Sequence, residues 1–119
     1  MSPLELVPTT IRDLMQATLT SPGVTALELR QAVKTRAAAL GGADRPMVDL
    51  PDELARYVTK VAKHAYKVTE EDIEELKGCG YSEDAIFEIT LCAAVGASMA
   101  RLERGLEILT HDSPSPAEE

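Results

Sequence analysis

The chain has 119 residues, a formal net charge of −8 and few aromatic side chains: one Phe, three Tyr and no Trp. This length corresponds to a single domain, and the negative charge, with Lys and Arg scattered singly, argues against nucleic acid and membrane surfaces as partners. The N-terminal sequence MSPLELVPTT lacks the basic and apolar regions of a signal peptide. We therefore expect a cytoplasmic protein whose core is built from Leu, Ile, Val, Ala and Met, a composition that suits closely packed helices.

The pattern of caps and apolar residues predicts an all-α fold of about five helices, with no strand. The first helix begins at Thr10, with Asp13 completing a capping box, and ends at a Ser-Pro-Gly sequence. The second begins at Thr25, with Glu28 in the same role, and ends at a loop over residues 41–50. The apolar stripes are Ile11, Leu14, Met15 and Leu19 in the first helix, and Leu29, Val33, Ala37 and Leu40 in the second.

The third and fourth helices have the clearest local signals. The third starts near Pro51-Asp52 and carries the strongest amphipathic pattern of the chain. The fourth is a short helix, Thr69–Lys77, with Thr69 and Asp72 forming its capping box. The apolar residues that we expect to be buried are Leu54, Tyr57, Val58, Val61, Ala62 and Ala65 in the third helix, and Ile73 and Leu76 in the fourth.

The fifth helix is predicted to run from Ser82, its N-cap, to about Leu109. Its residues Ile89–Ala100 carry no charge, and this stretch spans only about 18 Å as a helix, too short to cross a bilayer. A helix that is apolar nearly all round must be covered on all sides, so we expect a homo-oligomer. Small residues on one side either permit close packing within the subunit or form the subunit contact; they are Ala93, Gly96, Ala97 and Ala100.

The fifth helix ends the predicted fold. We interpret residues 1–110 as one helical domain. Residues 111–119, HDSPSPAEE, are interpreted as a disordered acidic tail, because they have no large apolar side chain to bury.

Glu88 is the first candidate site residue, because it is the only charge between Asp84 and Arg101. A carboxylate in such a run is either paired or has a raised pKa, and we expect Glu88 to be buried with Arg101 of another helix or His64 as its partner. Cys92 lies one turn later on the same face, and an acid beside a thiol is the arrangement of a proton relay. The alternatives are a structural role for Glu88, core packing for Cys92, and a solvated Arg101 whose stem covers apolar surface.

His64 and the two cysteines are the remaining candidates. His64 lies at the edge of the apolar stripe, either in a cleft or as a boundary residue bonded to a backbone carbonyl. Cys79 and Cys92 are expected to be free thiols, because no CxxC occurs and the two lie thirteen positions apart; whether either has a redox role stays open. Cys and His do not occur at the local spacing of zinc ligands, so no metal and no cofactor are expected.

The second half of the chain carries a characteristic order of caps, turn residues and core residues. The positions are Val68, Thr69, Asp72, Ile73, Leu76, Gly80, Tyr81, Ser82, Glu83, Asp84, Ile86, Phe87, Glu88, Arg101 and Leu102. This order, over roughly residues 51 to 109, resembles the C-terminal half of the alkylhydroperoxidase D-like, or carboxymuconolactone decarboxylase-like, superfamily. The resemblance implies an all-helical domain that assembles as a dimer, trimer or larger ring.

Thiol-active members of that superfamily carry a CxxC motif followed by a His, with a Glu upstream. If His64 is taken as that His, the two cysteines would fall seven and four residues before it. These positions hold Tyr57 and Lys60 in this chain. The redox motif is therefore missing, and the resemblance transfers no catalytic residue and implies no hydroperoxide reduction here.

Three functions remain open from the sequence. The first is an alkylhydroperoxidase D-like protein without CxxC that binds a small ligand in an oligomer. The second is a non-redox lyase or isomerase that uses Glu88 and His64 as acid and base in a cleft between subunits. The third is an interaction subunit of a partner enzyme. The sequence specifies neither the substrate or ligand nor the number of subunits.

Overall fold

The computed structural model describes residues 13, 16, 17 and 23–110. Within these residues it contains four α-helices and one short 3-10 helix, and no strand, so the predicted all-α class is confirmed. The elements are α2 (Leu27–Leu40), α3 (Asp52–His64), η2 (Ala65–Lys67), α4 (Glu70–Gly78) and α5 (Glu83–Thr110). Of the first predicted helix, only Asp13, Gln16 and Ala17 are described, all helical and exposed. The predicted tail, residues 111–119, lies outside the described part of the chain.

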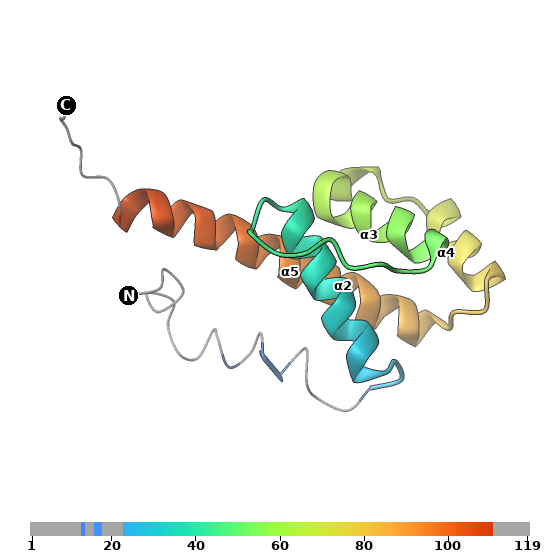
Figure 1. Cartoon of the computed structure of the whole chain (residues 1–119). Coiled ribbons are helices and arrows are strands. Elements are labelled where there is room, and N and C mark those ends of the chain that lie inside the picture. Colours follow the sequence, from blue (N-terminus) through green and yellow to red (C-terminus); the bar gives the residue numbers. More distant parts are fainter. Residues whose placement is uncertain (1–12, 14–15, 18–22, 111–119) are drawn as a thin grey trace.

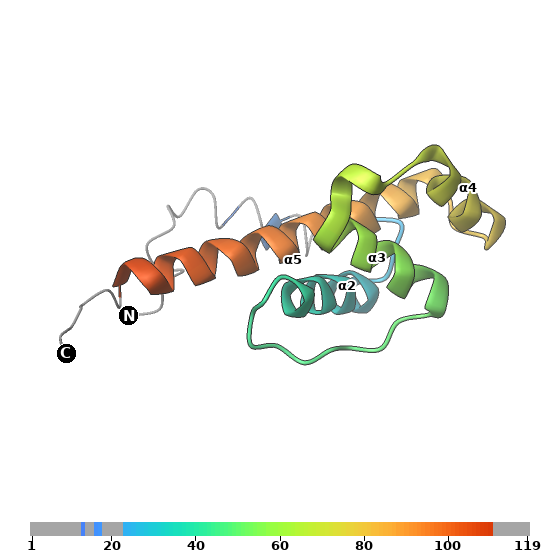
Figure 2. The same cartoon turned by 90° about the horizontal axis from the view of Figure 1, so that it is seen from above.

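The long helix α5 organises the fold (Figure 1). Helix α2 crosses it, α3 lies beside α2 on the same side of α5, and α4 sits near the N-terminal end of α5 (Figure 2). The C-terminal turns of α5 extend beyond the other three helices in both views. One side of α5 is therefore covered by helices of the same chain.

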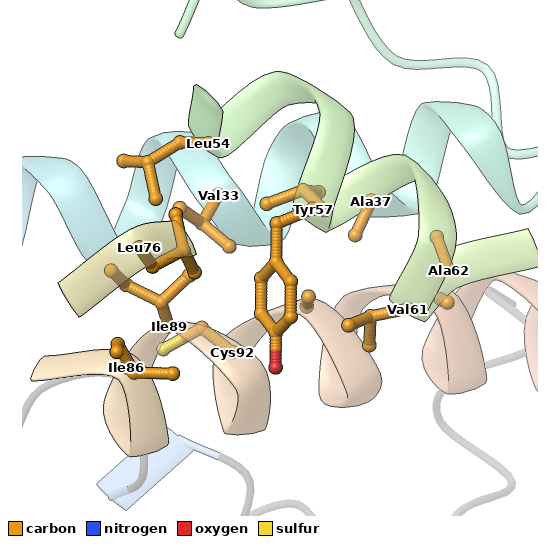
Figure 3. Close-up of a cluster of buried hydrophobic side chains, with 13 residues drawn as sticks. Val33, Ala37, Leu54, Tyr57, Val61, Ala62, Leu76, Ile86, Ile89 and Cys92 are labelled. Atoms are coloured by element: carbon orange, nitrogen blue, oxygen red, sulfur yellow. The ribbon is translucent and has the colours of Figure 1, made fainter. Parts of the chain in front are cut away.

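The core is a single cluster between these helices (Figure 3). Its largest fully buried side chains are Leu54, Leu76, Ile89, Val33, Val58 and Cys92. The predicted stripe of α3 is confirmed for all its members but one. Ala65 is exposed, because the α-helix ends at His64 and the chain continues as the 3-10 turn η2. Tyr57 reaches from α3 across the cluster, with its hydroxyl at the end remote from α3 (Figure 3).

Small residues bring α2 and α5 into close backbone contact. Ala93, Gly96, Ala97 and Ala100 are all buried. A Cβ atom placed on Gly96 would lie 2.4 Å from the carbonyl oxygen of Lys34, so only glycine fits at this crossing without a shift of backbone. Of the two interpretations of these residues, close packing inside the subunit is the one that the structure shows.

The predicted caps are confirmed for α4 and α5 and wrong for α2. The capping box of Thr69 and Asp72 is present, and the Ser82 hydroxyl oxygen accepts the Ala85 N–H at 3.1 Å. Helix α2 instead begins after Ala26, which offers no side-chain cap. The Thr25 hydroxyl is not free to cap α2, because it donates to a carboxylate of α5, as described below.

The uncharged residues Ile89–Ala100 alone are too short to cross a bilayer, but the whole of α5 is longer. By length and composition, its 28 residues, Glu83–Thr110, are sufficient to cross a membrane, with at most two charges in an 18-residue stretch. The core helix of a soluble protein passes the same test, and 39% of this stretch of α5 is buried among the described residues. The predicted absence of a membrane partner stays a prediction.

We predict that Gly96→Ala destabilises the protein whereas Gly105→Ala does not. At Gly96 the new methyl group meets the Lys34 carbonyl, and such overpacking costs about 1–3 kcal/mol. A Cβ on Gly105 has nothing within 4 Å, so the higher helix propensity of Ala stabilises by up to about 1 kcal/mol. Urea unfolding followed by circular dichroism measures both changes. Equal stabilisation by the two substitutions would show that α2 and α5 do not approach this closely.

Candidate functional site

Glu88 of α5 is held by the residues just before α2. Its Oε2 accepts the Val24 N–H at 2.9 Å. Its Oε1 accepts the Thr25 N–H at 2.9 Å and the Thr25 hydroxyl at 2.6 Å. A Cβ on Gly23 would lie 2.5 Å from Oε2, so a larger residue at position 23 would displace the end of the Glu88 side chain. The carboxylate therefore fastens the start of α2 to α5.

This arrangement corrects part of the sequence prediction for Glu88. The expected hydrogen-bonding partner exists, but it is the 24–25 segment and not Arg101 or His64. The side chain is also only partly buried. The pKa of Glu88 is lowered, chiefly by the Thr25 hydroxyl and then by the Thr25 backbone N–H. Glu88 is therefore an ionised anchor near neutral pH and is poorly suited to donate a proton.

The two thiols lie in contrasting surroundings, and both are free as predicted. Cys79 is exposed and Cys92 is buried in the core. Burial raises the pKa of Cys92, the nearby Arg30 opposes this, and Glu88 raises it further. Since the thiolate is the reactive form, this environment supports the core-packing role of Cys92 over the proton relay.

His64 lies at the C-terminal end of α3, exposed, with its ring edge-on to Tyr66 at 6.1 Å between centroids. Arg101 donates from Nη2 to the Ala62 carbonyl oxygen, so the end of α3 lies beside Arg101. Positions 88 and 101 are thirteen residues apart on α5, which is about 20 Å of helix. Glu88 and His64 therefore do not meet within one subunit. Their meeting across a subunit boundary stays a prediction.

Two hollows flank Tyr57 between α3, α4 and α5. The first, which we call the charged hollow, has a volume of about 160 Å³. It is lined by Glu53, Arg56, Tyr57, Lys60, Asp72, Glu75 and Leu76. Four of its five charges form ion pairs, Arg56 with Glu75 and Lys60 with Asp72, each at 2.8 Å, and the fifth, Glu53, accepts the Tyr81 hydroxyl at 3.0 Å. A ligand entering here would have to break existing ion pairs.

The second, which we call the apolar hollow, has a volume of about 340 Å³ and is lined by Tyr57, Ile73, Glu83, Ile86, Phe87 and Thr90. This volume lies within the usual range of small-molecule sites. Two of its polar lining residues are bonded to each other, since the Tyr57 hydroxyl lies 2.6 Å from Thr90 Oγ1; Tyr57 is buried, whereas Phe87 is 66% exposed. The apolar hollow thus has mostly apolar walls and one hydrogen-bonded pair of hydroxyl groups, those of Tyr57 and Thr90.

Sequence reasoning missed the apolar hollow. It assigned Tyr57 to the core stripe and did not single out Phe87 or Thr90. Two features of the sequence could have indicated it. Phe87 stands beside the charged Glu88 on a helix, and Tyr57 stands in an apolar stripe although its hydroxyl needs a hydrogen-bond partner. Tyr57 and Lys60, which were compared above with the two cysteines of the CxxC motif, both line the charged hollow, and Tyr57 lines the apolar hollow as well.

No protein-family model, no curated protein and no solved structure matches the chain. The class of protein is therefore defined by geometry: a small all-helical protein with an apolar hollow between three helices. Among the residues that the structure describes, no three His, Cys, Asp or Glu side chains are grouped as metal ligands would be.

We predict that Glu88→Gln lowers stability more than Glu83→Gln and flattens its acid dependence. Glu88 has a folded-state pKa below its ordinary value of 4.5, so its contribution is present above pH 4.5 and is lost as pH falls through the folded pKa. Removing the charge weakens hydrogen bonds from residues 24 and 25, and a hydrogen bond to a charged group contributes about 1.5–3 kcal/mol. Glu83 forms only an exposed ion pair with Lys77, of small value. Thermal melts from pH 7 to pH 3 test this, and identical curves for the two variants would contradict the anchoring role.

Proposed function

We propose that this chain is a cytoplasmic, homo-oligomeric protein of the alkylhydroperoxidase D-like type that binds a small apolar ligand and performs no thiol redox chemistry. The observation that carries this proposal is the apolar hollow, whose walls are Ile73, Ile86 and Phe87 and whose volume is about 340 Å³. A preformed recess of this kind is the usual form of a small-molecule site.

The driving force for binding is the burial of exposed wall residues by the ligand. Phe87 is largely exposed and Ile73 is partly exposed. A ligand that covers them removes apolar surface from water, at about 25 cal/mol for each Å². By contrast, the charged hollow offers ion pairs that a ligand must displace. The apolar hollow is therefore the better binding site.

Oligomerisation is supported by a stripe of uncharged residues along α5 that the described helices leave exposed. Its positions recur every three or four residues, and apolar side chains alternate there with the small residues Ser98 and Gly105. The apolar members are Phe87, Leu91, Ala94, Leu102 and Leu109. Such a stripe is the surface by which helices associate. Phe87 belongs to both the stripe and the apolar hollow, so a second subunit on the stripe would border the ligand.

The same stripe favours a second candidate function, an interaction subunit of a partner enzyme. In that case a different protein covers the stripe in place of a second copy. The lyase or isomerase hypothesis has weaker support, because Glu88 is ionised and anchored and lies far from His64 within the subunit.

Ligand binding is tested by titrating the protein with toluene and benzyl alcohol while recording amide NMR spectra. We expect shifts at Ile73, Ile86 and Thr90, with affinity in the millimolar range typical of so small a ligand. Phe87→Ala should weaken binding, whereas Met47→Ala, a truncation of an exposed apolar side chain outside both the apolar hollow and the stripe on α5, should not. If neither compound shifts these residues, the proposed function is wrong.

The oligomer is tested by light scattering at micromolar concentration. We expect a mass that is a multiple of 12.8 kDa, and we expect Leu91→Asp to reduce it, because a charge in an apolar contact is costly to bury. Lys63→Asp, on the exposed surface of α3, is the control and should leave the mass unchanged. A wild-type mass near 12.8 kDa contradicts the oligomer, and an oligomer that survives Leu91→Asp contradicts the stripe as its interface.

A further inference from the structure

The hydrogen bonds at the base of the apolar hollow run in a fixed direction. Thr90 Oγ1 donates to the Ile86 carbonyl oxygen at 2.6 Å, and a carbonyl oxygen can only accept. A threonine hydroxyl has one proton, and that proton is used in this bond. The 2.6 Å contact between Tyr57 and Thr90 must therefore use the proton of Tyr57, with Thr90 Oγ1 as the acceptor.

This direction leaves the apolar hollow without a side-chain donor. The Tyr57 oxygen keeps only a lone pair to offer, because its proton is bound to Thr90. The remaining polar lining residue is Glu83, which pairs with Lys77 at 2.7 Å. Lys77 lowers the pKa of Glu83, so this carboxylate is ionised and also only accepts. Every polar side chain that lines the apolar hollow is therefore an acceptor.

We propose that the apolar hollow selects neutral, ring-sized apolar molecules that carry a hydroxyl group, such as a phenol or an aromatic alcohol. The ring lies against Ile73, Ile86 and Phe87, and the hydroxyl donates to the Tyr57 oxygen. Ethers, aldehydes and ketones of the same shape have no proton to donate. Their oxygen lone pairs would face the lone pair of the Tyr57 oxygen, so their binding is disfavoured. A carboxylate ligand is rejected by Glu83, and an ammonium group loses its hydration without an unpaired anion to replace it.

This inference rests on the proposed function, and the test separates the two. Benzyl alcohol and benzyl methyl ether share a ring and an oxygen, but only the alcohol donates. A net hydrogen bond of ordinary strength corresponds to roughly fivefold tighter binding of the alcohol by the wild-type protein. Titrations followed at Ile73, Ile86 and Thr90 by NMR give both dissociation constants, with benzoate as the charged comparison.

Two variants test the role of the hydrogen-bond direction. Thr90→Val removes the acceptor of the Tyr57 proton, which then becomes a donor toward the apolar hollow, so the ether should bind within about twofold of the alcohol, as expected from the same bond strength. Thr90→Ser keeps a hydroxyl that can bond to the Ile86 carbonyl and should keep the wild-type preference. A change in ligand preference between these variants cannot come from a general loss of stability.

The outcomes are distinct. If neither compound binds the wild-type protein, the proposed function and this inference are both overturned. If the alcohol and the ether bind the wild-type protein equally well, the ligand site stands and the donor selectivity is wrong. If Thr90→Ser loses the preference as fully as Thr90→Val, the direction of the Tyr57 bond does not determine the selectivity.

Discussion

The fold depends on the close approach of α2 and α5. With Gly96 against the Lys34 carbonyl, the two helix backbones meet with little side-chain volume between them, and the remaining core forms around this contact. Helix α3 then covers the angle between them with Leu54, Val58 and Val61. A core with few aromatic residues has little bulky material to fill a wide gap, so narrow spacing is a condition of adequate packing.

Glu88 extends this contact about two turns nearer the N-terminal end of α5. Three hydrogen bonds hold the chain just before α2, so α2 is fixed both along its length by small residues and at its entry by a charge. The charge that interrupts an otherwise apolar run therefore has a structural explanation. It requires neither a catalytic role nor a cation from a second subunit.

The parts of the fold that could be predicted from sequence were the local ones. The stripe of α3, the capping box at Thr69 and the N-cap at Ser82 each involve residues within one or two turns of each other. The partner of Glu88 could not be predicted in this way, since it lies 63 and 64 positions away along the chain. The Tyr57–Thr90 pair, 33 positions apart, depends likewise on how the helices are placed. Periodicity places Tyr57 in the core, but it does not say that Tyr57 also lines a recess or that its hydroxyl meets Thr90.

The projecting end of α5 has a consequence for the dynamics of the protein. Its last turns, which carry the exposed Ile108 and Leu109, extend beyond the other described helices (Figure 1), and a helix end with few buried apolar contacts opens at low free energy. Local opening of these turns would expose their amide hydrogens to exchange, whereas residues 89–100 lie in the part of α5 that packs on the core. A molecule that covers this end gains apolar contact area and must also supply the free energy that keeps the helix wound. The number of C-terminal turns of α5 that stay helical would therefore depend on whether another molecule covers them.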